Sequence, residues 1–109
     1  YGAYSQDMIY TPEDVSSIKQ YAYLRGIQII LELDSPAHAG SGWEWGVETG
    51  LGNLAVCVAQ EPWRSFCIEP PCGQLNPVNP NVFDVLRDIY RDSLEILGND
   101  SIIHLGGDE

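Results

Sequence analysis

Apolar residues recur at helical spacing in two segments of the chain. Over residues 12–25 they stand at positions 15, 18 and 22, and over residues 82–97 they form one face while charged residues form the other. A capping box precedes the first segment, in which Thr11 caps the helix and Asp14 bonds back to it, and Gly26 follows as a stop signal. We therefore predict helices over 12–25 and 82–97.

Two short apolar runs fit buried β-strands. Residues 27–33 (IQIILEL) and 101–105 (SIIHL) are rich in β-branched or aliphatic side chains and are flanked by Gly or Asp. Residues 34–81, between the first strand and the second helix, are rich in Gly, Pro, Asn and Trp and have little periodicity. Because a loop this long in a compact domain is usually functional or cross-linked, we expect a long active-site loop over 34–81.

The order of helix, strand, long loop, helix and strand is typical of a parallel α/β protein. Two strands cannot form a stable parallel sheet, since both faces and both edges need cover. A complete (β/α)8 TIM barrel takes about 250 residues, whereas this chain has 109. Since the chain has two predicted strands where such a barrel has eight, we interpret residues 1–109 as a fragment of one catalytic barrel domain, about a quarter to a third of it.

Net charge narrows the classes of partner. Sixteen acidic against five basic residues give a formal charge of −11, which argues against a nucleic-acid binder or a basic membrane-surface module. The longest apolar run, residues 27–33, is interrupted by Gln28 and Glu32 and is far shorter than the roughly 18 residues of a membrane span. We expect no nucleic-acid partner and no membrane span in this segment.

Three cysteines, Cys57, Cys67 and Cys72, lie within sixteen positions. No histidine is near enough in sequence for a typical zinc motif, so a disulfide in an oxidising compartment is the better interpretation. Three pairings are open; in one of them Cys57 and Cys67 close a short hairpin and leave Cys72 for another partner. A glycosylation sequon at Asn99 also favours the secretory pathway, so we expect a secreted or lysosomal protein.

The carboxyl ends of the two predicted strands carry the main candidates for catalytic residues. Asp34 and His38 follow the first strand, and Asp108-Glu109 follow the second; in α/β barrels, catalytic residues lie at these ends. Adjacent strand residues point to opposite faces, so this acidic pair cannot supply the two facing carboxylates of an ordinary glycosidase. Either a second group lies elsewhere, or the substrate supplies the nucleophile, or the pair is a solvated acidic loop.

Three sequence blocks at and between the strand ends resemble a known enzyme family. Residues 104–109 read HLGGDE, residues 34–40 read DSPAHAG, and EPW at 61–63 is followed by CIEPPCGQLNP at 67–77. The first block is similar to the H-x-G-G-D-E signature of family 20 glycoside hydrolases, the β-N-acetylhexosaminidases, and the second to their D-x-P-x-H segment. The third resembles the arthropod chitin-degrading branch of that family.

This resemblance implies a substrate-assisted retaining mechanism without a metal or another cofactor. Glu109 matches the general acid/base that protonates the glycosidic oxygen. Asp108 matches the residue that orients the 2-acetamido group of the substrate, whose oxygen is the nucleophile. His38 matches a histidine that bonds to the catalytic Glu and is itself held by an Asp from an earlier strand, which the 109 residues do not include.

The resemblance also implies a substrate class. Terminal non-reducing N-acetylglucosamine or N-acetylgalactosamine would be removed from chitooligosaccharides or N-glycans. The alternative is a non-catalytic carbohydrate-binding relative of the same fold. We expect the 109 residues by themselves to be inactive, and the full-length protein could assemble as a homodimer.

Two polar residues near the strand ends keep alternative roles. We assign Asp34 to substrate binding, and it could also orient His38 or cap a turn. Asp34 and His38 could instead form a metal pair with Asp108 or Glu109, although the family needs no metal. For His104, a packed and hydrogen-bonded role is favoured over chemistry.

Aromatic residues in the long loop are candidates for sugar contacts, because aromatic faces stack on sugar rings. We favour Trp63 for a subsite on the reducing side of the scissile bond, with Glu69 as an acceptor for a sugar hydroxyl. Trp43 and Trp45 serve equally well as sugar contacts or as anchors for the loop.

Overall fold

A computed structural model describes residues 3–98 and 102–107 of the chain. The helix α1 spans Pro12–Tyr23, and its capping box is present: Asp14 N–H donates to Thr11 Oγ1 at 3.1 Å and Thr11 N–H donates to Asp14 Oδ2 at 2.9 Å. The helix ends two residues before the predicted position 25, because Leu24 serves as the C-cap and Gly26 turns the chain with a φ of +70°.

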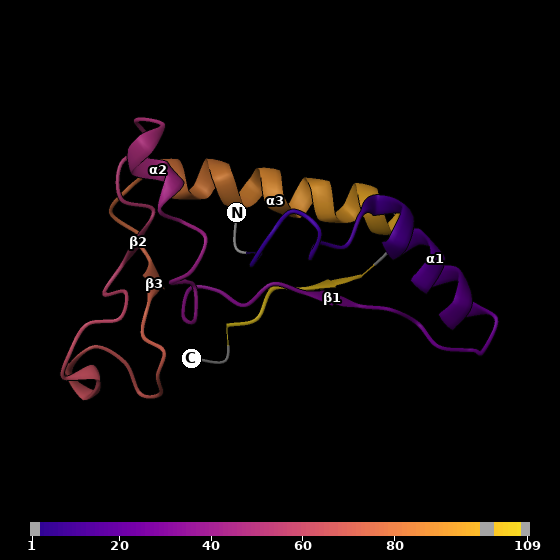
Figure 1. Cartoon of the computed structure of the whole chain (residues 1–109), viewed down its shortest axis with the longest axis horizontal. Coiled ribbons are helices and arrows are strands. Elements are labelled where there is room, and N and C mark those ends of the chain that lie inside the picture. The colour runs from indigo at the N-terminus through magenta and orange to yellow at the C-terminus, as the bar shows by residue number, and fades with distance from the viewer. Residues whose placement is uncertain (1–2, 99–101, 108–109) are drawn as a thin grey trace.

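The helix α3 spans Asn81–Leu97 and has one apolar face, as its periodicity predicts. Val82 and Leu97, at its two ends, are each only 1% exposed. The acidic and basic residues of its other face pair along the helix, as in the contact of 2.8 Å between Arg87 Nη2 and Asp84 Oδ1. This amphipathic helix is the element along which the rest of the chain is arranged (Figure 1).

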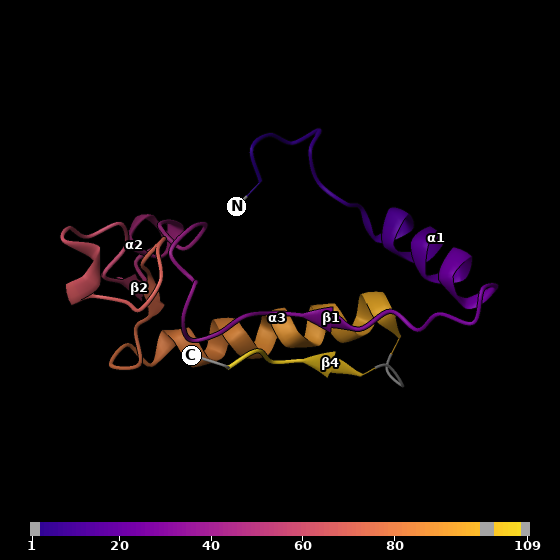
Figure 2. The ribbon, with the colours of Figure 1, turned by 90° about the horizontal axis from the view of Figure 1, so that it is seen from below.

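Two strands pair in parallel alongside α3 (Figure 2). The strand β1 spans Leu31–Glu32 and β4 spans Ile103–His104, with Leu31 opposite Ile103 and Glu32 opposite His104. Both are shorter than the predicted 27–33 and 101–105, since each has only the other as a neighbour among the described residues. The expected adjacency of the two strand ends is nevertheless present.

The connection predicted as a loop contains four short elements. These are the helix α2 (Trp45–Glu48), the strands β2 (Ala55–Val56) and β3 (Gln74–Leu75), which pair antiparallel, and the 3₁₀ helix η1 (Trp63–Ser65). They gather at the N-terminal end of α3, opposite the end where α1 lies (Figures 1 and 2). We call residues 39–80 the loop lobe.

The loop lobe has a small core of its own. Ala39, Leu54 and Leu75 pack with Val82 of α3, and Trp43, Trp45, Leu51, Val85 and Leu86 surround them. The side chains of three asparagines replace missing backbone partners: the amides of Asn79 and Asn81 both donate to Leu51 O, at 2.8 and 2.9 Å, and Asn76 donates to Asn53 O at 2.9 Å. Local turns held by these side chains explain an ordered segment without sequence periodicity.

The chain therefore has mixed α/β structure with one parallel strand pair, as expected, while the described residues contain no closed barrel. Apolar side chains around the strand pair are exposed, among them Ile27, Ile30 and Ile102. Within residues 3–98 and 102–107, no helix is long and apolar enough to cross a membrane.

Candidate active site

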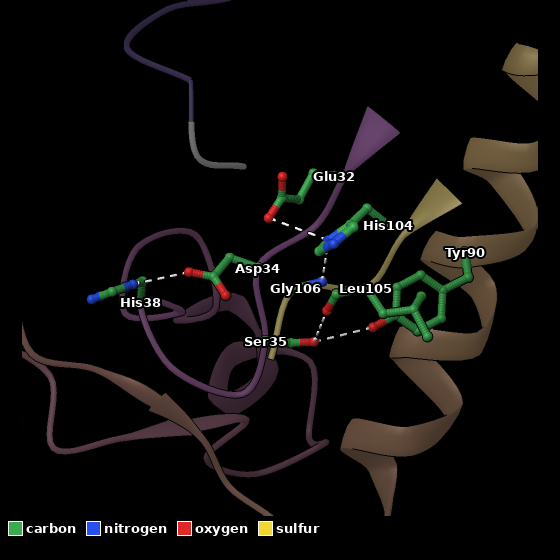
Figure 3. Close-up of polar contacts among 8 residues, drawn as sticks. All are labelled: Glu32, Asp34, Ser35, His38, Tyr90, His104, Leu105 and Gly106. Carbon is green, nitrogen blue, oxygen red and sulfur yellow. Dashed lines mark hydrogen bonds and ion pairs between the residues drawn. The ribbon is translucent and has the colours of Figure 1, made fainter. Parts of the chain in front are cut away.

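Asp34 and His38 lie in the turn that leaves β1, and their side chains are in contact (Figure 3). His38 Nδ1 is 2.9 Å from Asp34 Oδ2, and each side chain is 35% exposed. An ionised carboxylate only accepts hydrogen bonds, so Nδ1 carries the proton that is donated to Asp34. When the ring is neutral, its lone pair is then on Nε2.

His38 adopts a left-handed backbone conformation with a φ of +52°. Such a φ is uncommon outside glycine but is more frequent for histidine than for most residues. Two hydrogen bonds hold the turn to the loop lobe: Ala39 N–H donates to Gly73 O at 3.0 Å, and Leu75 N–H donates to Pro36 O at 2.9 Å. The loop lobe thus fixes the backbone on both sides of His38.

Glu32 and His104 form a cross-strand pair on the same side of the two strands as Asp34 (Figure 3). His104 Nδ1 is 3.3 Å from Glu32 Oε1 and accepts a hydrogen bond from Gly106 N–H at 3.1 Å. A ring nitrogen that accepts cannot donate at the same time, so the two contacts belong to different proton states. The hydrogen bond predicted for His104 is present, but the predicted packed role is wrong, since its side chain is 59% exposed.

The ends of β1 and β4 approach each other closely at Gly106. A Cβ atom on Gly106 would lie 2.7 Å from Asp34 Oδ1 and 2.8 Å from Asp34 Cα, and the residue has a φ of +67°. Leu33 N–H donates to His104 O at 3.1 Å and extends the strand pairing to this point. Only glycine combines this backbone conformation with this separation.

Ser35 and Tyr90 also meet at this junction. Ser35 Oγ donates to Leu105 O at 3.1 Å and lies 3.2 Å from the hydroxyl of Tyr90 in α3 (Figure 3). These two residues and Glu32 were not singled out from the sequence. The predicted strand pairing was a signal for Glu32, since it places Glu32 near His104, but no local pattern indicates Ser35 or Tyr90.

Asp108 and Glu109, the two predicted catalytic carboxylates, lie outside the described residues. In sequence they follow Gly106-Gly107 directly, a few residues after β4, the strand that pairs with β1. The described geometry therefore brings the predicted His38 and Asp34 to the same strand ends from which Asp108-Glu109 continue.

Trp63 and Glu69 lie in the loop lobe and flank, in sequence, residues 64–68, which line a hollow at the surface; neither residue lines the hollow itself. The hollow is lined by Pro36-Ala37 from the turn after β1, by residues 64–68 and by Gln74. Trp63 is half-buried in η1, with the Arg64 guanidinium 4.3 Å from its ring centre, and Glu69 is exposed. The segment between these two residues is thus next to the Asp34–His38 turn.

Trp43 and Trp45 pack against the core of the loop lobe. Of the two roles that the sequence left open, the anchoring role agrees with this burial. Among residues 3–98 and 102–107, no three His, Cys, Asp or Glu side chains come together as a metal site.

The disulfide joins Cys67 and Cys72, whose Cα atoms are 5.5 Å apart. The suggested hairpin pairing of Cys57 with Cys67 is therefore wrong, and Cys57 is a free, half-buried thiol. The physical reason is local: residues 67–72 turn back on themselves, whereas Cys57 follows β2. A disulfide needs Cα atoms within about 7 Å, and sequence spacing does not reveal that distance.

Comparison with known proteins places the sequence of this chain in a family. The profile of the glycosyl hydrolase family 20 catalytic domain matches residues 1–109, the whole chain. The chain belongs to glycosyl hydrolase family 20. The strand-end blocks that resemble this family are thus part of a match that runs through all the elements described above.

Individual relatives in the family agree. The chain is 48% identical over 109 residues to the probable beta-hexosaminidase fdl of Drosophila melanogaster, covering 100% of the chain and 16% of that relative. It is 44% identical over 108 residues to a chitooligosaccharidolytic beta-N-acetylglucosaminidase of Bombyx mori (99% of the chain, 17% of the relative). A beta-hexosaminidase subunit beta of Felis catus is 35% identical over 108 residues (99% and 18%). The chain thus spans about one-sixth of the length of these curated relatives.

Proposed function

We propose that the protein is a β-N-acetylhexosaminidase that removes terminal non-reducing N-acetylhexosamine from chitooligosaccharides, and that these residues belong to a (β/α)8 barrel. One observation carries the proposal: Asp34 and His38, 2.9 Å apart, stand beside the strand end that leads to Asp108-Glu109. In a barrel of this kind, strand ends form the active site. The family match and the names of the insect relatives support the substrate class.

In the proposed reaction the acetamide oxygen of the substrate attacks C1 while the glycosidic C1–O bond breaks. Glu109 gives its proton to the leaving oxygen, and Asp108 orients the acetamide group and stabilises the charge that develops on it. Water then adds to C1 of the cyclised intermediate, Glu109 takes its proton, and the acetamide is restored with retention of configuration. No facing carboxylate is needed, which accounts for two adjacent acids in place of an opposed pair.

In this proposal Asp34 and His38 hold the proton of Glu109 in place. In the proposed arrangement His38 Nδ1 donates to Asp34, and Nε2 of the neutral ring accepts from the carboxyl group of Glu109. The loop lobe supports this arrangement through the hydrogen bonds on both sides of the His38 turn. Trp63 and Glu69 are our candidates for contacts to the leaving sugar, because the segment between them lines a hollow with Pro36-Ala37.

We also propose a secretory-pathway protein, either secreted or lysosomal. The Cys67–Cys72 disulfide supports an oxidising compartment, and the Asn99 sequon is consistent with it. N-glycans as a second substrate and a homodimer of the full-length protein stay predictions; glycan profiling and light scattering test them.

The test is Glu109→Gln in the full-length protein that carries this segment, assayed on an aryl N-acetylglucosaminide. Loss of the general acid should lower kcat by about 100- to 10,000-fold. Glu95→Gln, on the exposed side of α3, is the matched control and should retain activity. An inhibitory thiazoline mimic of the cyclised intermediate would support acetamide participation.

Two results would contradict the proposal. An unchanged rate of hydrolysis in Glu109→Gln would show that Glu109 is not the general acid. A wild-type protein that binds chitooligosaccharide but does not cleave it would favour the non-catalytic alternative.

A further inference from the structure

The hydroxyl of Ser35 joins three elements at the candidate active site. It donates to Leu105 O, at the end of β4, at 3.1 Å, and it lies 3.2 Å from the hydroxyl of Tyr90 in α3. Ser35 is the residue after Asp34, in the turn that leaves β1. Figure 3 shows both contacts meeting at the Ser35 hydroxyl.

The direction of both hydrogen bonds follows from the number of protons. A serine hydroxyl has one proton, and here it is donated to Leu105 O. Tyr90 must therefore donate its own proton to Ser35 Oγ. The result is a short chain from Tyr90 through Ser35 to the Leu105 carbonyl, and each member polarises the next.

This chain acts where the two halves of the site approach most closely. Ser35 is the neighbour of Asp34, which holds His38, and Leu105 is the neighbour of Gly106, three residues before Glu109. Gly106 leaves no room for a Cβ atom against Asp34. A change of a fraction of an ångström in the distance between Ser35 Oγ and Leu105 O therefore changes the separation of the two strand ends.

We propose that Ser35 and Tyr90 are positioning residues that set the separation between the end of β1, which carries Asp34–His38, and the end of β4 at Leu105-Gly106, from which the sequence continues to Asp108-Glu109. The inference rests on the proposed hydrolase function and deepens it. In this inference both residues act through the backbone of Leu105, which Ser35 contacts directly and Tyr90 contacts through Ser35. Their contribution is to place the proton donor and its histidine, and misplacement at that level is costly to the rate.

Three substitutions in the full-length enzyme test this inference on an aryl N-acetylglucosaminide. Tyr90→Phe keeps the ring and removes the donor, and Ser35→Ala removes both bonds. Each should lower kcat by about 3- to 10-fold with KM unchanged, as expected when a transition-state interaction is lost. Ser35→Thr keeps the hydroxyl and should restore most of the rate.

The double variant and a matched control separate positioning from general stability. Since Tyr90 acts only through Ser35, adding Tyr90→Phe to Ser35→Ala should produce no further loss of kcat. Ser93→Ala is the control, because Ser93 is a 7% exposed serine of the same helix whose hydroxyl donates within it, to Ile89 O at 2.7 Å. It should leave kcat unchanged.

Several kinetic outcomes would overturn the inference. These are wild-type kcat in Ser35→Ala, an equal fall of kcat in Ser93→Ala, a rise in KM that accounts for the whole effect, or additive losses of kcat in the double variant.

Hydrogen exchange of the peptide 102–107 tests the link between Ser35 and the end of β4 without relying on activity. Ser35→Ala should speed exchange there, and unchanged exchange would contradict the link even in an active enzyme. A wild-type enzyme without hydrolysis but with this exchange effect would instead refute only the proposed function.

Discussion

The loop lobe and the strand pair differ in how they are stabilised. The loop lobe buries its own apolar residues, with Leu54 at 1% and Leu75 at 4% exposure, and asparagine side chains bond its turns. The strand pair leaves apolar side chains uncovered, with Ile102 at 59% and Ile30 at 50% exposure. The segment without sequence periodicity is thus the self-contained one.

This difference between the loop lobe and the strand pair indicates which part of the candidate site is held in place within the described residues. The Asp34–His38 turn contacts both regions, since it follows β1, its Pro36 carbonyl accepts from Leu75 N–H of the loop lobe, and Ala39, directly after the turn, donates to Gly73 O within the lobe. A two-stranded parallel sheet is not stable alone and needs cover on both faces. We infer that the loop lobe stabilises the turn locally, whereas the strand ends depend on neighbouring elements of the complete domain.

The strongest test of a self-contained loop lobe is Leu54→Ala. Removing this buried side chain, which packs against Gly46, should destabilise the lobe by about 2–5 kcal/mol. Hydrogen exchange in the full-length protein should accelerate over 39–80 while peptides of β1 and β4 change little. Val78→Ala, at an 88% exposed position, is the control. Equal acceleration in both regions would show that they unfold as one unit.

A second test addresses the junction between the strand ends. Gly106→Ala places a methyl group 2.7 Å from Asp34 Oδ1, so we expect the strand ends to separate and kcat to fall about 100-fold. Gly26→Ala has the same backbone strain, with a φ of +70°, but no atom lies within 4 Å of the added Cβ. If Gly26→Ala lowered kcat as much, the close approach at Asp34 would not be the cause.

The disulfide provides a smaller test within the loop lobe. Cys72→Ser opens the turn of residues 67–72 and should destabilise it by about 2 kcal/mol, because a cross-link over a short loop restricts the unfolded chain. Faster exchange near Trp63 and a higher KM for longer chitooligosaccharides are expected. Cys57→Ser, at the free thiol, should have neither effect.

The smallest effect concerns α1, which lies away from both regions compared above. Hydrogen bonds from the Thr11 backbone and then its hydroxyl hold the pKa of Asp14 below its ordinary value. Because the native pKa is depressed, this contribution is present above the unfolded-state pKa and is lost as the pH falls through the native value. An NMR titration of the Asp14 carboxyl should show the low midpoint, and Thr11→Ala should raise it. Ser16→Ala should not change it.

Local signals explain which elements could be predicted. The Thr11–Asp14 capping box and the amphipathic pattern of residues 82–97 involve residues three or four positions apart, and both helices are present within two residues of the expected bounds. The predicted strands are in the right places but longer than the observed β1 and β4, because an apolar run indicates burial and not the length of a hydrogen-bonded ladder. The elements of the loop lobe were missed because contacts between distant residues, such as Asn79 with Leu51, hold them.

The same distinction applies to the site. The sequence by itself determined the Asp34–His38 spacing, the acidic pair at 108–109 and the family to which they point, since each is a local arrangement of residue types. Only the tertiary structure decided the cysteine pairing, the contact of Gly106 with Asp34 and the chain from Tyr90 through Ser35 to Leu105. The last two bring together residues separated by 55 to 72 positions, and such contacts form only when the packed strands and α3 bring them within hydrogen-bonding distance.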